Sequence, residues 1–360
     1  MKDPKPLQTY RKKIDKIDDE IIRLLNERAR QVIEIGKLKK AQDSQANLHT
    51  PAREAEILDR ICKTNPGPFP GEALRAVYRE IMSGSLSLEG PLKVAYLGPS
   101  ATFTHLACIR KFGSSAQYVP MTSIKEVFNE VERSRADFGV VPIENSTEGV
   151  VNHTLDMFID SNLQIYGEVL QEVSHNLLSK ADSLSAIKKI YSHPHAIAQC
   201  RNWLETNLPG VQVSEVHSTA RAAEICVDDP TSAAIASELA GQLYGLKALK
   251  TRIEDNINNY TRFLVLSLKP AERTGKDKTS IMLSVKDKVG ALYDLLRPFA
   301  STGVNLTKIE SRPSRRKAWE YIFFIDVEGH VGEERVKKAL EEVKARCLFF
   351  KILGSYPAHG

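Results

Sequence analysis

The sequence predicts a multidomain protein in which an all-α region, a two-lobed α/β region and a small α+β region follow one another. Near the N-terminus, apolar residues recur at steps of three and four, the period of a helix. Strand-like and helix-like segments alternate through the middle of the chain, as in α/β domains. Near the C-terminus, the order strand–helix–strand–strand–helix–strand follows a polar linker, which is typical of ferredoxin-like folds. We place the domains at residues 1–91, 92–270 and 278–356.

The composition excludes several classes of protein. Of the 360 residues, 42% are apolar and 26% are charged, as in ordinary globular proteins and unlike disordered or fibrous chains. The net charge of +5 is weak evidence for a nucleic-acid partner. There is neither a membrane-spanning apolar run nor the apolar core of a signal peptide. The five cysteines are widely spaced, which indicates reduced thiols rather than disulfides or a zinc site. We expect a cytoplasmic protein.

The N-terminal region is predicted to contain three helices. The first covers residues 7–40, and at 1.5 Å per residue it would be roughly 50 Å long. A helix of this length in a small domain is expected to pair with another long helix, for which a second subunit is one source. Thr50 and Pro51 are typical of a cap and a first helical position, so a second helix is expected over 52–63. A third is expected over 71–87.

Two cations of the first helix lie on its apolar side. Arg28 and Lys39 are eleven residues apart, which places them on one face together with Val32 and Ile35. Spacing alone favours side chains that extend past the edge of a packed stripe into water. The alternative is that both bind an anionic ligand inside a helical bundle, where the low dielectric strengthens the attraction.

A set of residues in this order resembles the all-helical chorismate mutases over residues 5–89. It comprises Arg11, Asn26-Glu27-Arg28, the segment 34–39, Arg53-Glu54, Ser85 and Glu89. In that family the long helices of two subunits intertwine, and each site takes an arginine from the partner, which Arg11 would supply here. The resemblance implies a candidate mutase site with these residues: Arg11, Arg28, Lys39, Thr50, Arg53, Glu54, Ser85 and Glu89.

The implied reaction explains these residue types. Chorismate rearranges to prephenate without a nucleophile or base, so the protein must hold a flexible dicarboxylate in its reactive shape. Three arginines, Arg11, Arg28 and Arg53, suit the carboxylates. Lys39 suits the ether oxygen, on which charge develops. Glu54 would bind the ring hydroxyl, and Ser85 would assist a carboxylate.

Two positions depart from the mutase pattern. Some relatives have glutamine where this chain has Glu89, and an ionised Glu89 would repel the charge that develops on the ether oxygen. We therefore expect that Glu89 must be protonated and that mutase activity rises toward acid pH. Thr50 falls where some relatives have aspartate, and its alternative role is a helix cap.

The middle region is expected to contain a largely parallel sheet, or two, with polar clusters at the strand ends. The strand candidates are 93–97, 138–142, 163–168, 189–191, 233–236 and 262–268, with helices such as 124–134, 196–206 and 220–227 between them. The polar clusters are 98–105, 142–149, 192–195 with Gln199, 217–220 and 258–263. Ligands of α/β folds bind at such strand ends, although about half of these residues could simply cap helices. His193-Pro194-His195 lacks the spacing of a metal site.

These five segments, in this order, resemble prephenate dehydratase over about residues 92–268. Thr261-Arg262-Phe263 matches the signature of that family, whose members have two α/β lobes, like periplasmic binding proteins, with the site between them. The resemblance places Thr261 near the leaving hydroxyl of prephenate and makes Glu144 a candidate for protonation or orientation. Hydrogen-bonding wall residues would be Asn145, Ser192, Gln199 and Ser218. Arg262 would bind a carboxylate, and Phe263 would pack on the ring or in the core.

The C-terminal region resembles the ACT amino-acid-sensing domain over about residues 279–355. Two segments carry the resemblance, Gly290-Ala291-Leu292 at a strand-to-helix turn and Glu310-Ser311-Arg312-Pro313 after the next strand. In that family they line a phenylalanine site at a subunit interface. A glycine permits close backbone approach, and helix N-terminal amides suit a carboxylate.

Together, the three regions predict an enzyme that converts chorismate to prephenate and prephenate to phenylpyruvate, with feedback inhibition by phenylalanine. No cofactor or metal is expected, and the assembly is expected to be a homodimer or a dimer of dimers. Two alternatives remain. The helical region could be only a dimerisation module of a monofunctional dehydratase, or the chain could be a non-enzymatic amino-acid sensor.

Overall fold

The computed structural model describes residues 5–42, 50–286, 288–313 and 321–358. The chain divides into two compact units. The first is Met1–Leu92 together with Phe112–Gln117, and the second is Lys93–Lys111 together with Tyr118–Gly360.

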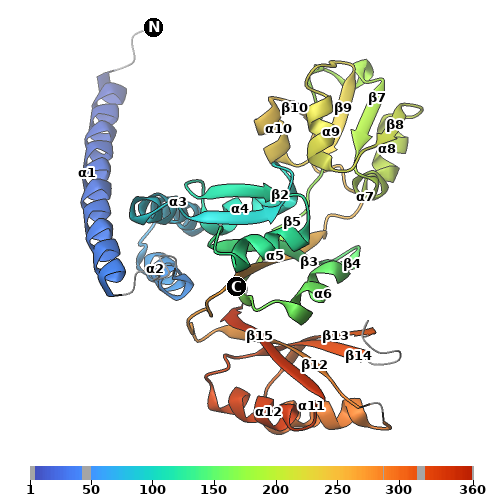
Figure 1. The fold of residues 1–360 in the computed structure, drawn as a ribbon. Helices are drawn as coiled ribbons and strands as arrows, with labels where there is room; N and C mark the ends of the chain where they lie inside the picture. Colours follow the sequence, from blue (N-terminus) through green and yellow to red (C-terminus); the bar gives the residue numbers. More distant parts are fainter. Residues whose placement is uncertain (1–4, 43–49, 287, 314–320, 359–360) are drawn as a thin grey trace. The chain divides into compact units, whose positions relative to one another are not determined.

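The first unit contains three helices, as the sequence predicts (Figure 1). They are α1 (Lys5–Gln42), α2 (Pro51–Thr64) and α3 (Gly71–Glu89). Both α1 and α2 pack against α3. Thr50 occupies the N-cap position of α2 and Pro51 its first turn, but the Thr50 side chain makes no capping hydrogen bond.

Much of the apolar surface of α1 is exposed in the single chain. Ile17, for example, is 58% exposed and Leu38 is 64% exposed. A stripe of this size in water is unfavourable, at about 25 cal/mol per Å² of apolar surface. The exposed large apolar residues among those described in α1 are Leu7, Tyr10, Ile14, Ile17, Ile21, Ile22, Leu24, Leu25, Ile35 and Leu38.

The loop Phe112–Gln117 is bound to α3 within the first unit. Glu80 accepts hydrogen bonds from the backbone amide of Ser114, at 3.0 Å, and from its hydroxyl. The Ser83 hydroxyl accepts from the amide of Ser115 at 3.1 Å. Gly113 has φ +73°, and a Cβ atom there would lie 2.4 Å from the Cβ of Ser83. Only glycine therefore fits at this point of contact.

The second unit begins with a lobe built on a six-stranded sheet in the order β2-β1-β3-β11-β5, with β4 paired to β3. Its strands are β1 (Lys93–Leu97), β2 (Gln117–Met121), β3 (Phe138–Asn145), β4 (Gly149–Val150), β5 (Gln164–Glu172) and β11 (Tyr260–Ser267). Its helices are α4 (Phe103–Phe112), α5 (Ile124–Glu132) and α6 (Asn152–Asp160). β2 contains Pro120, which is tolerated because this strand lies at the edge of the sheet.

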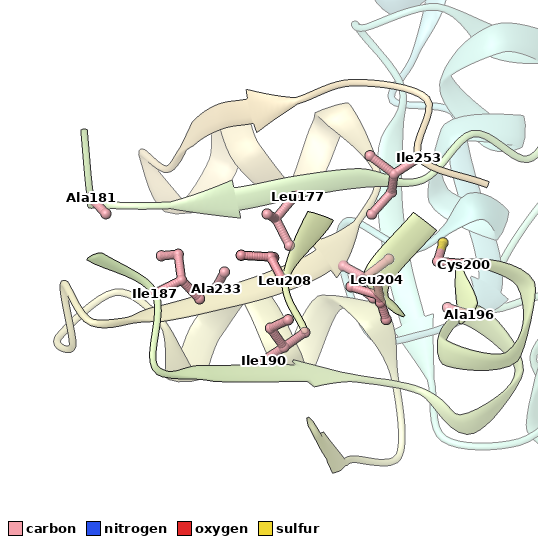
Figure 2. Close-up of a cluster of buried hydrophobic side chains, with 11 residues drawn as sticks. Leu177, Ala181, Ile187, Ile190, Ala196, Cys200, Leu204, Leu208, Ala233 and Ile253 are labelled. Carbon is pink, nitrogen blue, oxygen red and sulfur yellow. The ribbon is translucent and has the colours of Figure 1, made fainter. Parts of the chain in front are cut away.

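The second lobe is built on a five-stranded sheet in the order β10-β6-β9-β7-β8. Its strands are β6 (Asn176–Ser179), β7 (Lys189–Ser192), β8 (Gln212–Glu215), β9 (Ser232–Ala236) and β10 (Lys247–Lys250). Its helices are the 3₁₀ turn η1 (Leu184–Ala186), α7 (Pro194–Gln199), α8 (Arg201–Asn207), α9 (Thr219–Ile225) and α10 (Glu238–Tyr244). Figure 2 shows one core of this lobe, in which Leu177, Ile190 and Leu204 face one another.

Two expectations for this region are wrong. Both sheets are mixed rather than largely parallel. In the first sheet, β11 returns from the second lobe and pairs antiparallel with β3 and with β5. In the second sheet, β6 pairs antiparallel with β9 and with β10. In addition, the single helix expected over 196–206 is two helices that meet at Cys200, whose buried side chain belongs to the core in Figure 2.

The C-terminal part has the predicted βαββαβ order. It comprises β12 (Asp277–Ser284), α11 (Ala291–Ser301), β13 (Leu306–Pro313), β14 (Tyr321–Glu328), α12 (Glu334–Lys344) and β15 (Phe349–Pro357). The sheet order is β13-β14-β12-β15. An apolar core that includes Leu295, Phe299 and Val336 joins both helices to the sheet.

Candidate functional site

Two polar side chains meet where β3 ends and β11 begins. Asn145 and Thr261 are paired across the two strands, and the Asn145 amide donates to the Thr261 hydroxyl at 2.8 Å. A hydroxyl has one proton and two lone pairs. Because Thr261 accepts here, its own proton can be donated to a bound molecule.

A chain of hydrogen bonds continues from this pair to the second lobe. The Asn145 amide also donates to Asn259, at 2.8 Å, and the Asn259 amide donates to the side-chain oxygen of Gln199 at 2.9 Å. Gln199 in turn donates to Glu148 at 3.3 Å. Asn145 and Glu148 lie on the first lobe, whereas Gln199 ends α7 of the second. This chain of hydrogen bonds therefore contains polar groups from both lobes.

His175 joins the same chain from the segment between β5 and β6. Its Nε2 lies 2.8 Å from the side-chain oxygen of Gln199. Burial lowers the pKa of His175, partly offset by the hydrogen bond to Gln199 and by the charge of Glu254. Since an amide oxygen only accepts, Nε2 carries the proton of the neutral ring. Asn259, Glu148 and His175 were not predicted to be site residues. The first two lie inside polar clusters that the sequence reveals, but nothing in the sequence marks His175.

Three predicted dehydratase residues have structural contacts of their own. The buried Ser192 hydroxyl donates to the Ile235 carbonyl at 2.6 Å. Ser218 caps α9 and accepts from the amide of Arg221. Phe263 is 2% exposed and belongs to the core, as the alternative interpretation held.

Glu144 and Arg262 lie next to Asn145 and Thr261 in the chain, so their side chains point to the opposite face of the sheet. There Arg262 binds Glu168 at 2.6 Å, Glu144 at 3.1 Å and Asp326 at 2.8 Å. The structure therefore does not place Glu144 or Arg262 in one site with Thr261. The expected roles of Arg262 as a substrate-carboxylate ligand and of Glu144 in protonation are corrected on this ground.

The ionisation of these two residues agrees with an ion-pair role. Burial alone would lower the pKa of Arg262, but Tyr356 and three surrounding carboxylates raise it. Burial alone would raise the pKa of Glu144, but Lys308 and Arg262 hold it below its usual value. Both groups are therefore charged at neutral pH.

In the helical unit, Arg28 of α1 donates to the hydroxyl of Ser85 on α3. Glu89 lies against the backbone of Gly36, where a Cβ atom would be 3.0 Å from its Cγ. The structure thus brings two predicted mutase residues together on facing helices and packs a third against α1.

The other predicted mutase residues are less enclosed. Arg11 and Arg53 are exposed, and Arg53 pairs with Glu56 one turn along α2 at 2.6 Å. Lys39, Thr50 and Glu54 are half-buried. Arg11 lies near the start of α1, more than four helical turns before Arg28.

The predicted effector segments lie at the same end of the C-terminal sheet. Gly290, with φ +78°, caps α11 after β12, and 310–313 ends β13. Ser284 of β12 and Arg312 of β13 are both level with Ile322 of β14, so the two segments are separated by one strand. Leu292, Ser311 and Pro313 are exposed, while Ala291, Glu310 and Arg312 are half-buried.

The described residues contain no group of three or more His, Cys, Asp or Glu side chains arranged to hold a metal ion. Within the same described ranges, no helix combines the length and apolarity needed to cross a membrane.

Three protein-family models match the chain in succession. They are chorismate mutase type II over residues 10–90, prephenate dehydratase over residues 94–271 and the ACT domain over residues 279–345. All three families are those that the sequence motifs resemble.

Known proteins match the chain over its length. A bifunctional chorismate mutase/prephenate dehydratase of Aquifex aeolicus is 55% identical over 357 residues, which cover 98% of both chains. The protein of that name from Stutzerimonas stutzeri is 45% identical and covers 99% of both. A solved prephenate dehydratase from Arthrobacter aurescens, in complex with L-Phe, is 38% identical, with a TM-score of 0.69 over 74% of this chain and 90% of that one. This chain therefore belongs to the family of bifunctional chorismate mutase/prephenate dehydratases.

Proposed function

We propose that the chain converts chorismate to prephenate in its helical unit and prephenate to phenylpyruvate between its two α/β lobes. Phenylalanine, which is formed from phenylpyruvate, inhibits through the ACT domain. The observation that carries this proposal is the pair Asn145–Thr261, whose hydrogen-bonded chain reaches both lobes in a protein that matches bifunctional relatives along its whole length.

In the dehydratase reaction, prephenate loses carbon dioxide and water and becomes aromatic. Asn145 donates to Thr261, which leaves the Thr261 proton available for the departing hydroxyl. A threonine hydroxyl is a weak acid, so Thr261 assists by hydrogen bonding rather than by full proton transfer. Asn145, Gln199 and Asn259 provide amides that orient the substrate. Ser192 and Ser218 support the walls of the site through their structural contacts.

In the mutase reaction, Arg28 holds a carboxylate of chorismate beside Ser85, and Lys39 stabilises the ether oxygen. Protonated Glu89 donates a hydrogen bond to the same oxygen. Arg53 and Glu54 complete the site from α2, and the Thr50 carbonyl accepts from the Glu54 amide at 3.1 Å where that helix starts. A charged, partly enclosed site of this kind works by positioning the substrate.

We also propose that two chains form the mutase site. The exposed apolar residues of α1 support this, and so does a groove of about 680 Å³ between α1 and α3, lined by residues such as Leu25, Val77 and Leu88. A second α1 packed there would cover this surface and bring its Arg11 to the site. The dimer, or a dimer of dimers, acts in the cytoplasm, which agrees with five unpaired cysteines.

Phenylalanine binds at this end of the ACT sheet, with its carboxylate on the amides of Gly290 and Leu292 and its side chain beside the segment 310–313. The Ala291 amide donates to the Lys288 carbonyl at 3.1 Å and so holds the turn in which these amides lie. The glycine at φ +78° allows the backbone to approach the ligand closely.

One assay tests the whole proposal. Purified protein is given chorismate, and prephenate and phenylpyruvate are followed separately, with and without phenylalanine. Both products should appear, and phenylalanine should suppress phenylpyruvate. If only added prephenate is consumed, the helical unit is a dimerisation module. If a folded protein binds phenylalanine but consumes neither substrate, the chain is a sensor.

A further inference from the structure

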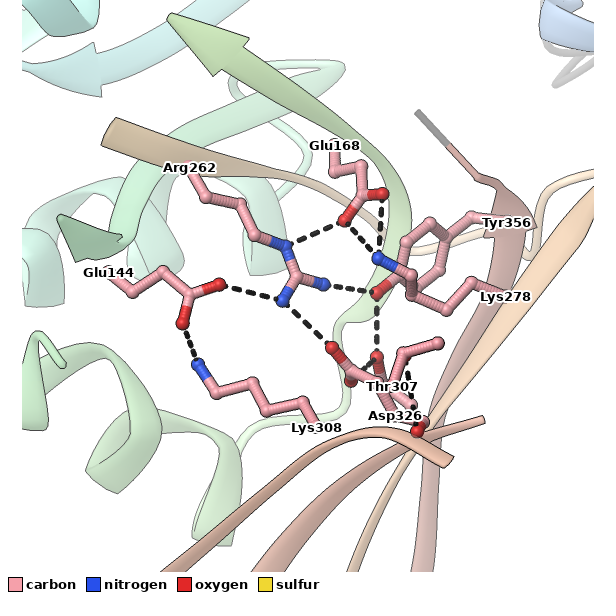
Figure 3. Close-up of polar contacts among 9 residues, drawn as sticks. Glu144, Glu168, Arg262, Lys278, Thr307, Lys308, Asp326 and Tyr356 are labelled. Carbon is pink, nitrogen blue, oxygen red and sulfur yellow. Dashed lines mark hydrogen bonds and ion pairs between the residues drawn. The ribbon is translucent and has the colours of Figure 1, made fainter. Parts of the chain in front are cut away.

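A cluster of charged residues joins the dehydratase strands to the ACT sheet (Figure 3). From the dehydratase side come Glu144 of β3, Glu168 of β5 and Arg262 of β11. Each of the four ACT strands contributes one residue: Lys278, Lys308, Asp326 and Tyr356. We call these seven residues the junction cluster.

The contacts of the junction cluster are close and mostly shielded from water. Arg262 lies at the centre, with Asp326 at 2.8 Å and the Tyr356 hydroxyl at 3.0 Å on the ACT side. Lys278 donates to Glu168 at 2.9 Å, and Lys308 binds Glu144. The side chain of Arg262 is 11% exposed and that of Glu168 is 3% exposed. Three cations face three carboxylates, so the charges balance within the cluster.

The cluster is directly connected to the catalytic pair. Glu144 precedes Asn145, Arg262 follows Thr261, and the two pairs are adjacent rungs of the β3–β11 ladder. A displacement of the Arg262 side chain that moves its backbone also moves Thr261. Buried ion pairs of this kind have discrete, geometrically strict arrangements.

The same cluster is connected to the effector segment through β13. Along β13, half-buried residues alternate with exposed ones. Lys308 and Arg312 lie on the half-buried face, where Lys308 binds Glu144 and Arg312 binds Asp156 of α6 at 2.7 Å. Ser311 and Pro313 lie on the exposed face. One face of β13 thus holds the dehydratase domain, while the other is available to the effector.

We propose that the junction cluster transmits the state of the ACT domain to Thr261 and Asn145, with Asp326, Tyr356 and Lys308 as positioning residues of the dehydratase reaction and Arg312 as a docking residue. This inference rests on the proposed function and deepens it, because it names the route of feedback. A network whose arrangement both sites bias is the physical requirement for such coupling.

The test uses the full chain and the variants Asp326→Asn and Tyr356→Phe, which keep side-chain shape and remove one contact of Arg262. The matched control is Glu342→Gln, which removes the 3.7 Å ion pair between Glu342 of α12 and Arg346, outside the cluster. Each protein is assayed for kcat and KM with prephenate, for the mutase rate, and for phenylalanine affinity by calorimetry. Hydrogen exchange of peptides covering β3 and β11 is followed with and without phenylalanine.

In the wild type and the control, phenylalanine should change the exchange of β3 and β11. In Asp326→Asn, kcat for prephenate should fall about tenfold, whereas KM, the mutase rate and phenylalanine affinity should change less than about threefold. Bound phenylalanine should then alter neither turnover nor exchange in that variant. Tyr356→Phe should show the same pattern more weakly and serves if Asp326→Asn does not fold.

Two results would overturn the proposal. One is wild-type exchange of β3 and β11 that does not respond to phenylalanine. The other is that Asp326→Asn and Tyr356→Phe both fold and still respond to phenylalanine as the wild type does, in turnover and in exchange. If the wild type itself does not turn over prephenate, the proposed function is refuted. The exchange measurement would still decide whether the ACT domain is coupled to β3 and β11.

Arg312→Met separates docking from effector binding. If Arg312 is a docking residue, the Arg312→Met variant should lose its inhibition by phenylalanine, while its affinity for phenylalanine stays within about threefold of the wild type. A fall of affinity by more than about tenfold, with inhibition intact at saturation, would make Arg312 an effector ligand and overturn its proposed role.

Discussion

The two proposed catalytic sites differ in how completely a single chain forms them. In the helical unit, Arg28 and Ser85 meet, but Arg11 and Arg53 are exposed and the apolar side of α1 is uncovered. In the α/β lobes, Asn145, Thr261, Asn259 and Gln199 already form a continuous hydrogen-bonded chain. The difference shows that a site on one long helix depends on what packs against it, whereas a site between two lobes of one chain is assembled by folding.

The largest expected effect separates the two sites. Thr261→Ala should lower dehydratase turnover by about 10²–10⁴-fold, because it removes the hydroxyl that assists the leaving group. Mutase turnover should be unaltered, as measured by prephenate formation from chorismate. Equal loss of both activities would indicate misfolding and remove the distinction.

The second prediction tests whether the mutase site needs two chains. Arg11→Ala and Arg28→Ala should each lower mutase activity by about 10²-fold or more, since each removes a charged contact to the substrate. Unfolding and refolding the two variants together should restore about a quarter of wild-type activity. Random pairing makes half of the dimers mixed, and one of the two sites in each mixed dimer is intact.

The matched control for this experiment is refolding of each variant alone, which should restore nothing. If each chain formed a complete mutase site by itself, refolding the two variants together would restore no mutase activity. Dehydratase activity should be the same in all samples, because that site lies within one chain.

A third prediction concerns the pH dependence of the mutase reaction. Mutase kcat/KM should rise as pH falls toward the acid range, because Glu89 must carry a proton to donate to the ether oxygen. Glu89→Gln donates at every pH, so its profile should be flat, and at neutral pH it should exceed the wild type by up to about tenfold. A wild-type profile that is already flat, or a variant profile of the same slope, would contradict this role.

The smallest expected effect is on stability and belongs to the α/β lobes alone. His175 is buried with a lowered pKa, so it is neutral when folded and takes up a proton when unfolded near its ordinary pKa of about 6.5. The unfolded state therefore binds more protons, and the free energy of unfolding should fall as pH decreases through this range. Chemical denaturation at several pH values should show a shallower dependence for His175→Gln.

The fold was largely predictable because its main signals are periodic. The three helices and the βαββαβ order follow from apolar spacing, and the structure contains both. Short strands such as β6 and β10, each of four residues, were not predicted. Strand direction was also not predictable locally, since the antiparallel course of β11 results from the return of the chain from the second lobe.

The dehydratase site was predicted in part for a similar reason. Motif resemblance identified Thr261 and Asn145, and the structure brings them together. It could not separate Arg262 from Thr261, although a strand period of two already places neighbours on opposite faces. Asp326 and Lys308, which hold Arg262 and Glu144, lie 64 and 164 residues away from their partners in the chain, and no local pattern marks such contacts.

The contact between Gly113 and Ser83 limits how the chain can be divided. Cutting between residues 91 and 92 looks natural from the sequence, yet the loop Phe112–Gln117 belongs to the compact unit of the helices. A fragment that starts at Leu92 would lose Glu80 and Ser83, the acceptors for the amides of Ser114 and Ser115. Transplanting the helical unit onto another dehydratase would meet the converse problem, because a recipient loop with any side chain at the position of Gly113 would collide with α3. Recombination between such genes should therefore succeed only when this short loop is inherited together with the helices.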